Sequence, residues 1–428
     1  MWEKFTRLFK IPELRERILF TLGAIIVFRL GTHISVPGVE AEALRNFFAT
    51  QSGGIFGFLN MFTGGALQRF SLFALGVTPY INSSIIFSLL TAVVPKLKEL
   101  QRQGREGRRK ITTYTRWTTL GLAAIQATAM SMLMVNQGLA KGGGWFFISS
   151  IISLTTGTVF LMWLGERITE NGIGNGISMI IMIGILSRFP SSIQRTYIEI
   201  SAGTVSPFWG LGYIVLIVAV IAGVIMVQQG QRKIVIQYAK RTTGRRIYGG
   251  HSSHLPIRVN QGGVIPIIFA SALLTIPVTV TQWIPSLGWL GVYVRNGSIP
   301  YMIAYVLLIF FFTYFYSSIV FDPNDVASNV RESGGFIPGV RPGKPTAAYI
   351  SNVLNRILLI GALFLAAIAL LPYLFTGVSG IQGMLIGGTA LLIVVGVGMD
   401  TIMQIEAHLV MRHYEGLAKA GGLLGRRR

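Results

Sequence analysis

The chain has 428 residues, 51% hydrophobic and 12% charged, with a mean hydropathy of +0.59, so it is more apolar than an ordinary soluble protein and is predicted to reside in a lipid bilayer. The absence of cysteine excludes disulfides, thiol catalysis, iron–sulfur clusters and thiolate metal sites. The net charge of +21 is consistent with basic cytoplasmic loops and anionic partners, and does not by itself indicate nucleic-acid recognition.

Ten apolar stretches approach the roughly 20 residues that a membrane-spanning helix needs, which predicts an all-α polytopic membrane protein. The opening stretch, "MWEKFTRLFKIPELRER", is charged and lacks a cleavage site, so we expect no removable signal peptide. The fifth apolar stretch is short, which indicates a helix sheltered by protein. The expected spans are about 18–36, 71–94, 117–136, 146–165, 177–190, 208–229, 263–284, 300–321, 355–375 and 381–403.

The distribution of Lys and Arg predicts the orientation, because basic loops stay on the cytoplasmic side of a membrane. With the N-terminus inside, 30 of the 37 basic residues fall in cytoplasmic segments and six fall in the opposite loops, while Arg29 lies within the first span. Both termini are therefore expected in the cytoplasm.

The segment between the first two spans, "GGIFGFLNMFTGGALQRF" (53–70), is apolar enough to be buried. It is too short and too rich in glycine to cross a membrane. From the residues alone, it could be an interfacial re-entrant stretch with no gating role.

Two of the expected cytoplasmic loops are much longer than the others. Residues 231–260 alternate apolar and polar side chains on both sides of Thr243 and Gly244, which predicts a basic hairpin of two short strands. Residues 322–349 contain prolines and glycines that predict an ordered but irregular loop presenting Arg341. The basic residues either enforce topology and contact anionic lipids, or dock on phosphates or acidic side chains of a ribosome or a motor protein.

No catalytic or metal-binding constellation is visible in the sequence. Of the 16 acidic residues, only Asp400 lies clearly within an apolar run, and we interpret it as a helix-end carboxylate or one paired with a neighbour. The HxxH pair of His251 and His254 lacks a third ligand nearby and is typical of solvated histidines. The glycines of "ENGIGNGIS" lack the strand and the Lys-Ser/Thr of a phosphate loop, and they predict a tight turn before the fifth span.

Prolines and small polar residues occur within several spans, among them Pro79, Asn82 and Pro266. Freed backbone groups at membrane depth are tolerated only inside protein or along a wet cavity, which predicts a central pathway. A secondary transporter of inverted repeats shares this topology but needs more ionisable groups within the membrane. A structural scaffold would explain the basic loops but not the polar residues within spans.

Six long stretches resemble the SecY family, the main subunit of the bacterial protein-conducting channel, and the likeness covers essentially the entire chain. The family implies two pseudo-symmetric halves of five helices around a pore that also opens sideways to lipid. Here the halves would be residues 1–190 and 191–428, the second carrying cytoplasmic loops at about 231–260 and 322–352. The stretches are "NMFTGGALQRFSLFALGVTPYINSSII", "MWLGERITENGIGNGIS", "QRKIVIQYAKRTTGRRIYGGHSSHLPIRVN", "GVIPIIFAS", "FDPNDVASNVRESGGFIPGVRPGKPTAAYI" and "GGTALLIVVGVGMD".

The resemblance also implies roles for particular residues. A sideways gate between the second and third spans and the seventh and eighth would be lined by Ser83, Ser84 and Ser88. A ring of branched aliphatic side chains would constrict the pore, with Val77 where many bacterial members have Ile. The ring residues are Val77, Ile81, Ile177, Ile181, Ile268 and Ile393.

In the same family, a short plug helix folds back into the outer funnel, and it coincides here with residues of about 53–67. The glycines at 53, 54, 64 and 65 can serve as its hinges. The expected plug residues are Phe56, Phe58, Leu59, Asn60, Met61, Phe62, Gly64 and Gly65.

Three arginines match docking positions of the family. Arg245 and Arg246 correspond to the loop tip that meets the ribosome, with its RNA, or the motor ATPase SecA, and Arg341 corresponds to a basic residue needed for translocation. The implied partners are SecE, usually SecG, SecA, translating ribosomes, polypeptides with signal sequences and anionic lipids. The resemblance implies a channel in the bacterial plasma membrane that moves unfolded secretory polypeptides and has no metal, cofactor or catalytic site of its own.

Overall fold

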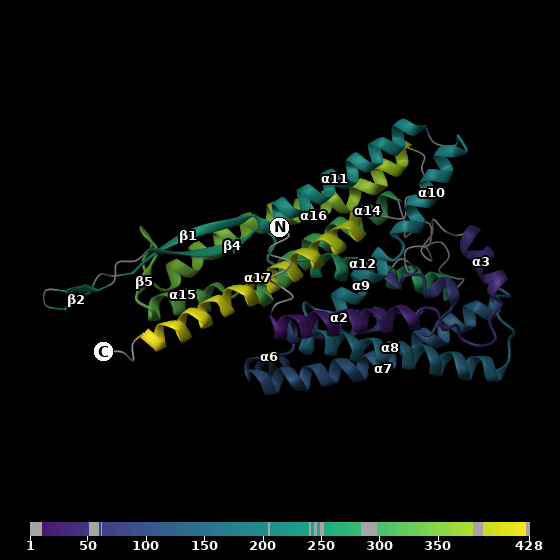
Figure 1. Ribbon diagram of the computed structural model, residues 1–428, viewed down its shortest axis with the longest axis horizontal. Helices are drawn as coiled ribbons and strands as arrows, with labels where there is room; N and C mark the ends of the chain where they lie inside the picture. Colours follow the sequence, from purple (N-terminus) through teal and green to yellow (C-terminus); the bar gives the residue numbers. More distant parts are fainter. Residues whose placement is uncertain are drawn as a thin grey trace.

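The computed structural model describes residues 11–50, 60, 62–203, 206–238, 241–243, 246–248, 252–283, 298–379 and 388–424, and most of them are helical (Figure 1). The N-terminal elements are α2 (Pro12–Gly31), α3 (Ala41–Thr50), η1 (Leu67–Arg69), α5 (Thr78–Val93), α6 (Pro95–Arg102), α7 (Arg105–Asn136), α8 (Gly144–Asn171), α9 (Gly176–Leu186) and α10 (Phe189–Ser201). The C-terminal elements are α11 (Pro207–Gln229), β1 (Gln231–Tyr238), β2 (Arg241–Thr243), β3 (Arg246–Tyr248), β4 (Ser252–Arg258), α12 (Ile265–Trp283), α14 (Ile299–Val320), α15 (Pro323–Glu332), β5 (Gly335–Phe336), α16 (Lys344–Ser379) and α17 (Gly388–Leu424).

The helices pack in two groups that follow the chain order. In the first group, α8 contacts α2, α7 and α9, and α5 packs on α7. In the second group, α14 lies between α12 and α16, and α17 contacts α11 and α16. The groups meet where α5 contacts α12 and where α9 contacts α17, and one large apolar cluster fills the space between them.

Each of the ten expected ranges contains a helix. By length and composition, seven helices of the described chain could cross a membrane, or eight if α5 and α6, bent by 99° at Val94, count as one span. The first expected span corresponds to α2, and the seventh to α12, whose apolar part is short. The count of ten remains a prediction.

The second expected span starts too early in the sequence. Residues 71–77 form turns that are mostly buried, and α5 begins only at Thr78. Pro79 lies in the first turn of α5 and Pro266 in the first turn of α12, where a missing N–H breaks no helical hydrogen bond. Contrary to expectation, neither proline interrupts a helix, whereas Pro277 lies inside α12.

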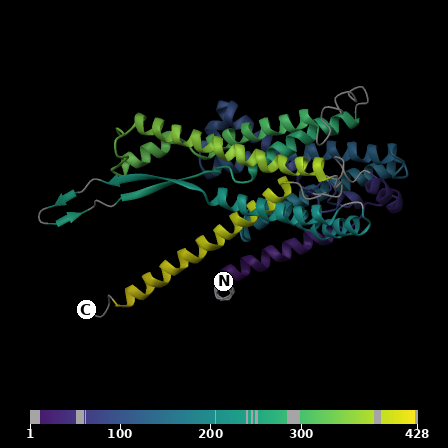
Figure 2. The same cartoon turned by 90° about the horizontal axis from the view of Figure 1, so that it is seen from above.

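The basic hairpin is confirmed, with more regular structure around it than expected. β1 pairs antiparallel with β4, β2 pairs with β3, and the hairpin projects beyond the helices at the end where α17 also extends (Figure 2). Residues 322–349 are only partly irregular. The Asp322 carboxylate caps α15 by accepting from the Asn324 N–H at 2.9 Å, whereas residues 337–343, with Arg341, form an irregular loop as expected. Within the same loop β5 pairs with β1, and α16 begins at Lys344.

Close helix packing in the N-terminal group gives a stability prediction. A Cβ on Gly157 of α8 would overlap the carbonyl oxygen of Leu72. Gly157→Ala should therefore destabilise the protein by about 1–3 kcal/mol, seen as a lower unfolding temperature in detergent. Gly121→Ala on α7, where nothing lies within 4 Å of the new Cβ, is the matched control. Equal unfolding temperatures for the two variants would contradict this packing.

Candidate functional site

The six expected ring residues come from four helices in both groups. Val77 is the N-cap of α5 and Ile81 lies near the start of this helix, while Ile177 and Ile181 belong to α9, Ile268 to α12 and Ile393 to α17. All six belong to the central apolar cluster, five of them at most 7% exposed and Ile177 packed against the others. The structure thus brings together, in one dry region, side chains that lie up to 316 positions apart in the sequence.

The short helix α9 is held in place by its own N-terminal turn. The side-chain oxygen of Asn175 accepts from the Ser178 N–H at 3.1 Å, and the Thr169 hydroxyl accepts from the Gly176 N–H at 2.9 Å. Gly174 has φ +83°, and a Cβ on Gly176 would overlap the Gly165 carbonyl. The predicted tight turn is confirmed, and it fixes the position of Ile177 and Ile181.

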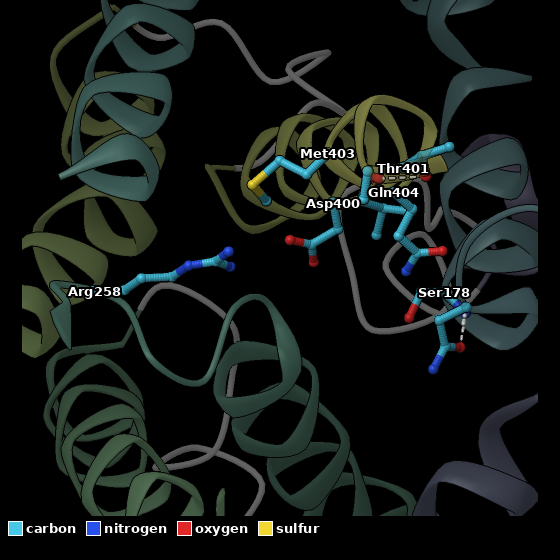
Figure 3. Close-up of a pocket in the computed structure, with 9 residues that line it drawn as sticks. Ser178, Arg258, Asp400, Thr401, Met403 and Gln404 are labelled. Atoms are coloured by element: carbon cyan, nitrogen blue, oxygen red, sulfur yellow. Dashed lines mark hydrogen bonds between the residues drawn. The ribbon is translucent and has the colours of Figure 1, made fainter. Parts of the chain in front are cut away.

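A polar pocket of about 300 Å³ opens between the two helix groups, beside the apolar cluster (Figure 3). Gln404 of α17 accepts a hydrogen bond from the Gly174 N–H at 3.0 Å and so joins the groups across the pocket wall. Along α17, Ile393, Val397 and Gln404 follow helical spacing, so one face of the helix runs from the ring to this pocket. The lining residues are Asn175, Ser178, Arg258, Val397, Asp400, Thr401, Met403, Gln404 and Ala407.

Asp400 is not a helix-end carboxylate, contrary to expectation, because α17 continues to Leu424. Its half-buried carboxylate faces the pocket, with the Arg258 side chain extending toward it from the end of β4 (Figure 3). No carboxylate oxygen of Asp400 lies within 4.0 Å of a basic side chain in the described part of the chain. The pocket therefore presents one anionic and one cationic group to whatever enters it.

The three expected gate serines do not share one environment. The Ser83 hydroxyl is fully buried and donates to the Thr115 carbonyl at 2.8 Å, so it holds α5 against α7 within the first helix group. Ser84 and Ser88 are half-buried and lie four residues apart, on one face of α5. α5 also contacts α12 of the second helix group.

The expected plug is described only at its C-terminal end. Asn60 is 2% exposed, and Phe62 is half-buried against the central cluster. Gly64 and Gly65 have φ values of +66° and +87° in a turn. Phe56, Phe58, Leu59 and Met61 lie outside the described residues.

The base of the hairpin is fixed to a helix. Ile234 of β1 and Ile257 of β4 are buried in a separate apolar cluster with Ile350 and Leu354 of α16. At the tip, Arg246 belongs to β3 and Arg245 lies outside the described residues. Exposed Arg232 and Lys233 add positive charge at the base.

Arg341 is exposed on a loop that shares this support. The loop follows β5, and Ile337 is buried in the same cluster as the hairpin base. The Arg341 carbonyl accepts from the Thr346 hydroxyl at 2.8 Å, and Gly339 and Gly343 on either side have positive φ. The hairpin base and the Arg341 loop thus share one apolar support, and the hairpin lies at the end of the molecule opposite α3 and α10 (Figure 1).

Among the described residues, no three His, Cys, Asp or Glu side chains gather as metal ligands would. His254 is exposed on β4, and His251 lies outside the described residues.

The sequence did not predict contacts between residues that lie far apart along the chain. Gly174 and Gln404 are 230 residues apart, and the sequence carries no signal for their hydrogen bond. Helical spacing past Ile393 places Val397 and the polar Gln404 on the same face of α17. A polar residue on that face could have indicated the pocket wall.

Comparison with known proteins gives a consistent result. The SecY family model matches residues 71–402. A protein translocase subunit SecY of Thermotoga maritima is 50% identical over 437 aligned residues, which cover 100% of both chains.

Solved structures agree with the fold. A protein-conducting channel superposes with a TM-score of 0.67 at 19% identity, covering 94% of this chain and 96% of that one. The Sec61 channel of a canine ribosome–channel complex superposes with a TM-score of 0.62 at 18% identity, with the same coverage.

Proposed function

Because this chain belongs to the SecY family and is a protein translocase subunit, we propose that unfolded secretory polypeptides pass through its ring of six aliphatic residues. Hydrophobic segments would leave sideways between α5 and α12 into the bilayer. Polar segments would thread the pore instead, since a charged or polar chain is costly in lipid.

The convergence of the ring residues carries this proposal. Val77, Ile81, Ile177, Ile181, Ile268 and Ile393 reach one apolar cluster from both helix groups, and the polar pocket lies beside them. Branched aliphatic side chains have no polar atoms to hold water or ions, and they can yield around a passing chain. The arrangement suits a constriction that excludes ions at rest and admits a polypeptide when the groups separate.

The basic surface of the hairpin and the Arg341 loop is proposed as the docking site for partners. The ribosome, with its phosphate-rich RNA, and the motor ATPase SecA both offer anionic targets. Docking would favour an open state, which makes the mechanism a shift of population between two conformations. We infer that a partner supplies the energy, and that SecE and SecG complete the assembly.

The proposed topology places both termini and the basic surface in the cytoplasm of a bacterial cell, with the spans in the plasma membrane. The two helix groups correspond to halves of residues 1–190 and 191–428. That boundary falls in the first turn of α10, so α10 would be the connection on which the halves move. Anionic lipid headgroups would contact the basic residues nearest the membrane.

Purified chain with SecE, reconstituted in lipid vesicles, distinguishes this function from a small-solute transporter. A channel subunit should co-purify with ribosomes or SecA and should admit a secretory precursor when SecA and ATP are added. Saturable uptake of a small solute, with no binding of either partner, would favour the transporter instead.

The ring gives a prediction for the resting channel. Ile81→Gly combined with Ile181→Gly should raise the resting ion conductance several-fold, because two buried side chains of the constriction are removed. Single-channel recording in planar bilayers would measure this effect, with Ile81→Val and Ile181→Val as the control that keeps branched side chains. Unchanged currents in the glycine variant would count against the ring.

A further inference from the structure

The turn after the expected plug helix is extensively hydrogen-bonded. We call residues 60 and 62–70 the anchor turn. The Asn60 carbonyl accepts from the Gly65 N–H at 3.0 Å and from the Thr63 hydroxyl at 3.2 Å, and its side-chain oxygen accepts from the Gln68 N–H at 3.0 Å. The Thr63 hydroxyl in turn accepts from the Leu67 N–H at 3.3 Å. These bonds close the turn on itself.

The anchor turn and the residues just after it are also attached to the segment that follows α2. The Phe70 carbonyl accepts from the Val36 N–H at 3.0 Å, and the Ile34 carbonyl accepts from the Leu72 N–H at 2.9 Å. Leu67 and Phe70 are at most 1% exposed, in an apolar cluster with Leu44 and Phe48 of α3. Moving this turn would therefore break backbone hydrogen bonds and expose buried apolar surface.

Arg29 reaches the centre of the anchor turn from the last turn of α2. One guanidinium nitrogen donates to the Gly64 carbonyl at 3.2 Å, and the Ser187 hydroxyl lies 3.5 Å from the same oxygen. No ion pair joins Arg29 to an acidic side chain among the described residues. Placing a cation within a span costs free energy, so such residues are usually retained for a function. Here the Arg29 guanidinium donates to a carbonyl of the anchor turn.

The anchor turn lies directly on α9, the helix that carries two ring residues. A Cβ on Gly184 would lie only 2.7 Å from the Phe62 carbonyl oxygen, and a Cβ on Gly64 only 3.0 Å from the Gly184 Cα. Gly184 is three residues from Ile181, on the same face of α9. The anchor turn is thus fixed next to the constriction itself.

We propose that Arg29 is a positioning residue that, through Gly64, fixes the C-terminal end of the expected plug (residues 60 and 62–67) on α9, so that this end stays in place when the channel opens. This inference rests on the proposed plug. Gly64 and Gly65 were expected to act as hinges because they are glycines. The inference assigns them instead to a fixed attachment. The positive φ of Gly64 then serves the close approach of this turn to Gly184 of α9.

A disulfide across the anchor turn tests whether it stays in place. A Cβ on Gly76 would lie 3.9 Å from the Thr63 Cβ, within the range that a disulfide spans. Since the chain has no cysteine, Thr63→Cys with Gly76→Cys forms a unique pair. Export into vesicles should be equal for oxidised and reduced protein, with each single cysteine variant as a control. A block on oxidation that is reversed by reduction would overturn the inference.

The same assay separates this inference from the plug itself. A tether that joins the plug helix to the ring, as described in the Discussion, should block export. If the tether and the Thr63–Gly76 disulfide both block export, the plug assignment is supported but the anchor turn must move, which contradicts the inference. If neither blocks export, the plug is wrong and the inference falls with it.

The role of Arg29 is tested by the resting ion current. Arg29→Met removes a hydrogen bond from a charged donor, so it should shift the equilibrium between the closed and displaced plug by about 10- to 100-fold toward the displaced form. The resting current should rise accordingly. Arg29→Lys, which keeps a cationic donor, should restore most of the closure. Arg15→Met, at an exposed position of the same helix, is the matched control. Wild-type current in correctly inserted Arg29→Met protein would contradict the assignment.

Discussion

Arg341→Glu should reduce SecA-driven export about 100-fold or more, without lowering the amount of protein in the membrane. The side chain is exposed, so reversing its charge leaves the packing of the helices intact. What changes is the contact with an anionic partner, where like charges repel. Export of a labelled precursor into vesicles that contain the chain, SecE, SecA and ATP measures the effect.

The rigidity of the loop is the reason to expect so large a loss at one position. The Thr346 hydroxyl bond to the Arg341 carbonyl and the buried Ile337 fix the backbone, so another basic residue cannot move into its place. Arg331→Glu, exposed in the last turn of α15, is a charge-matched control that should export normally. Normal export by Arg341→Glu would remove Arg341 from the docking site.

Tethering the plug to the ring should abolish export almost completely. Phe58→Cys in the expected plug helix and Ile268→Cys in the ring would be joined by a cleavable thiol-to-thiol reagent, and the chain offers no other thiol. A plug that must leave the pore cannot leave when it is bound to the wall. Export measured before and after cleavage shows whether the block depends on the tether.

A monofunctional thiol reagent on the same two cysteines is the control for this tether, since it adds comparable bulk without joining the segments. Export by the tethered protein at the rate of this control would mean that the expected plug helix does not need to leave the ring.

The sequence predicted the helices better than their ends. Residues 71–77 are apolar and buried, so hydropathy alone could not separate these turns from α5. Residues 322–349 looked irregular because of their prolines, yet Pro323 follows the capping Asp322 and starts α15, as proline does at a first helical position. α16 begins at Lys344, well before the expected ninth span, and α17 continues past the expected tenth span to Leu424.

The candidate site depended on information that local pattern does not contain. No periodicity joins Val77 to Ile393, and only the family resemblance indicated that they meet, which the central cluster supports. The hydrogen bond from Arg29 to Gly64 and the pocket between Arg258 and Asp400 required the tertiary structure. Glycine identity suggested flexibility at Gly64, whereas its neighbours in space show a close approach.

The continuity of α16 has a mechanical consequence. Its 36 residues extend about 54 Å, well beyond the roughly 30 Å of a bilayer's hydrocarbon core. Its N-terminal part carries the hairpin base through Ile350 and Leu354, and α16 also packs on α14 and α17. A continuous helix transmits force along its length, so a sideways push on the hairpin should tilt α16 and displace its C-terminal end. Force applied to the hairpin would thereby reach the opposite end of the C-terminal helices.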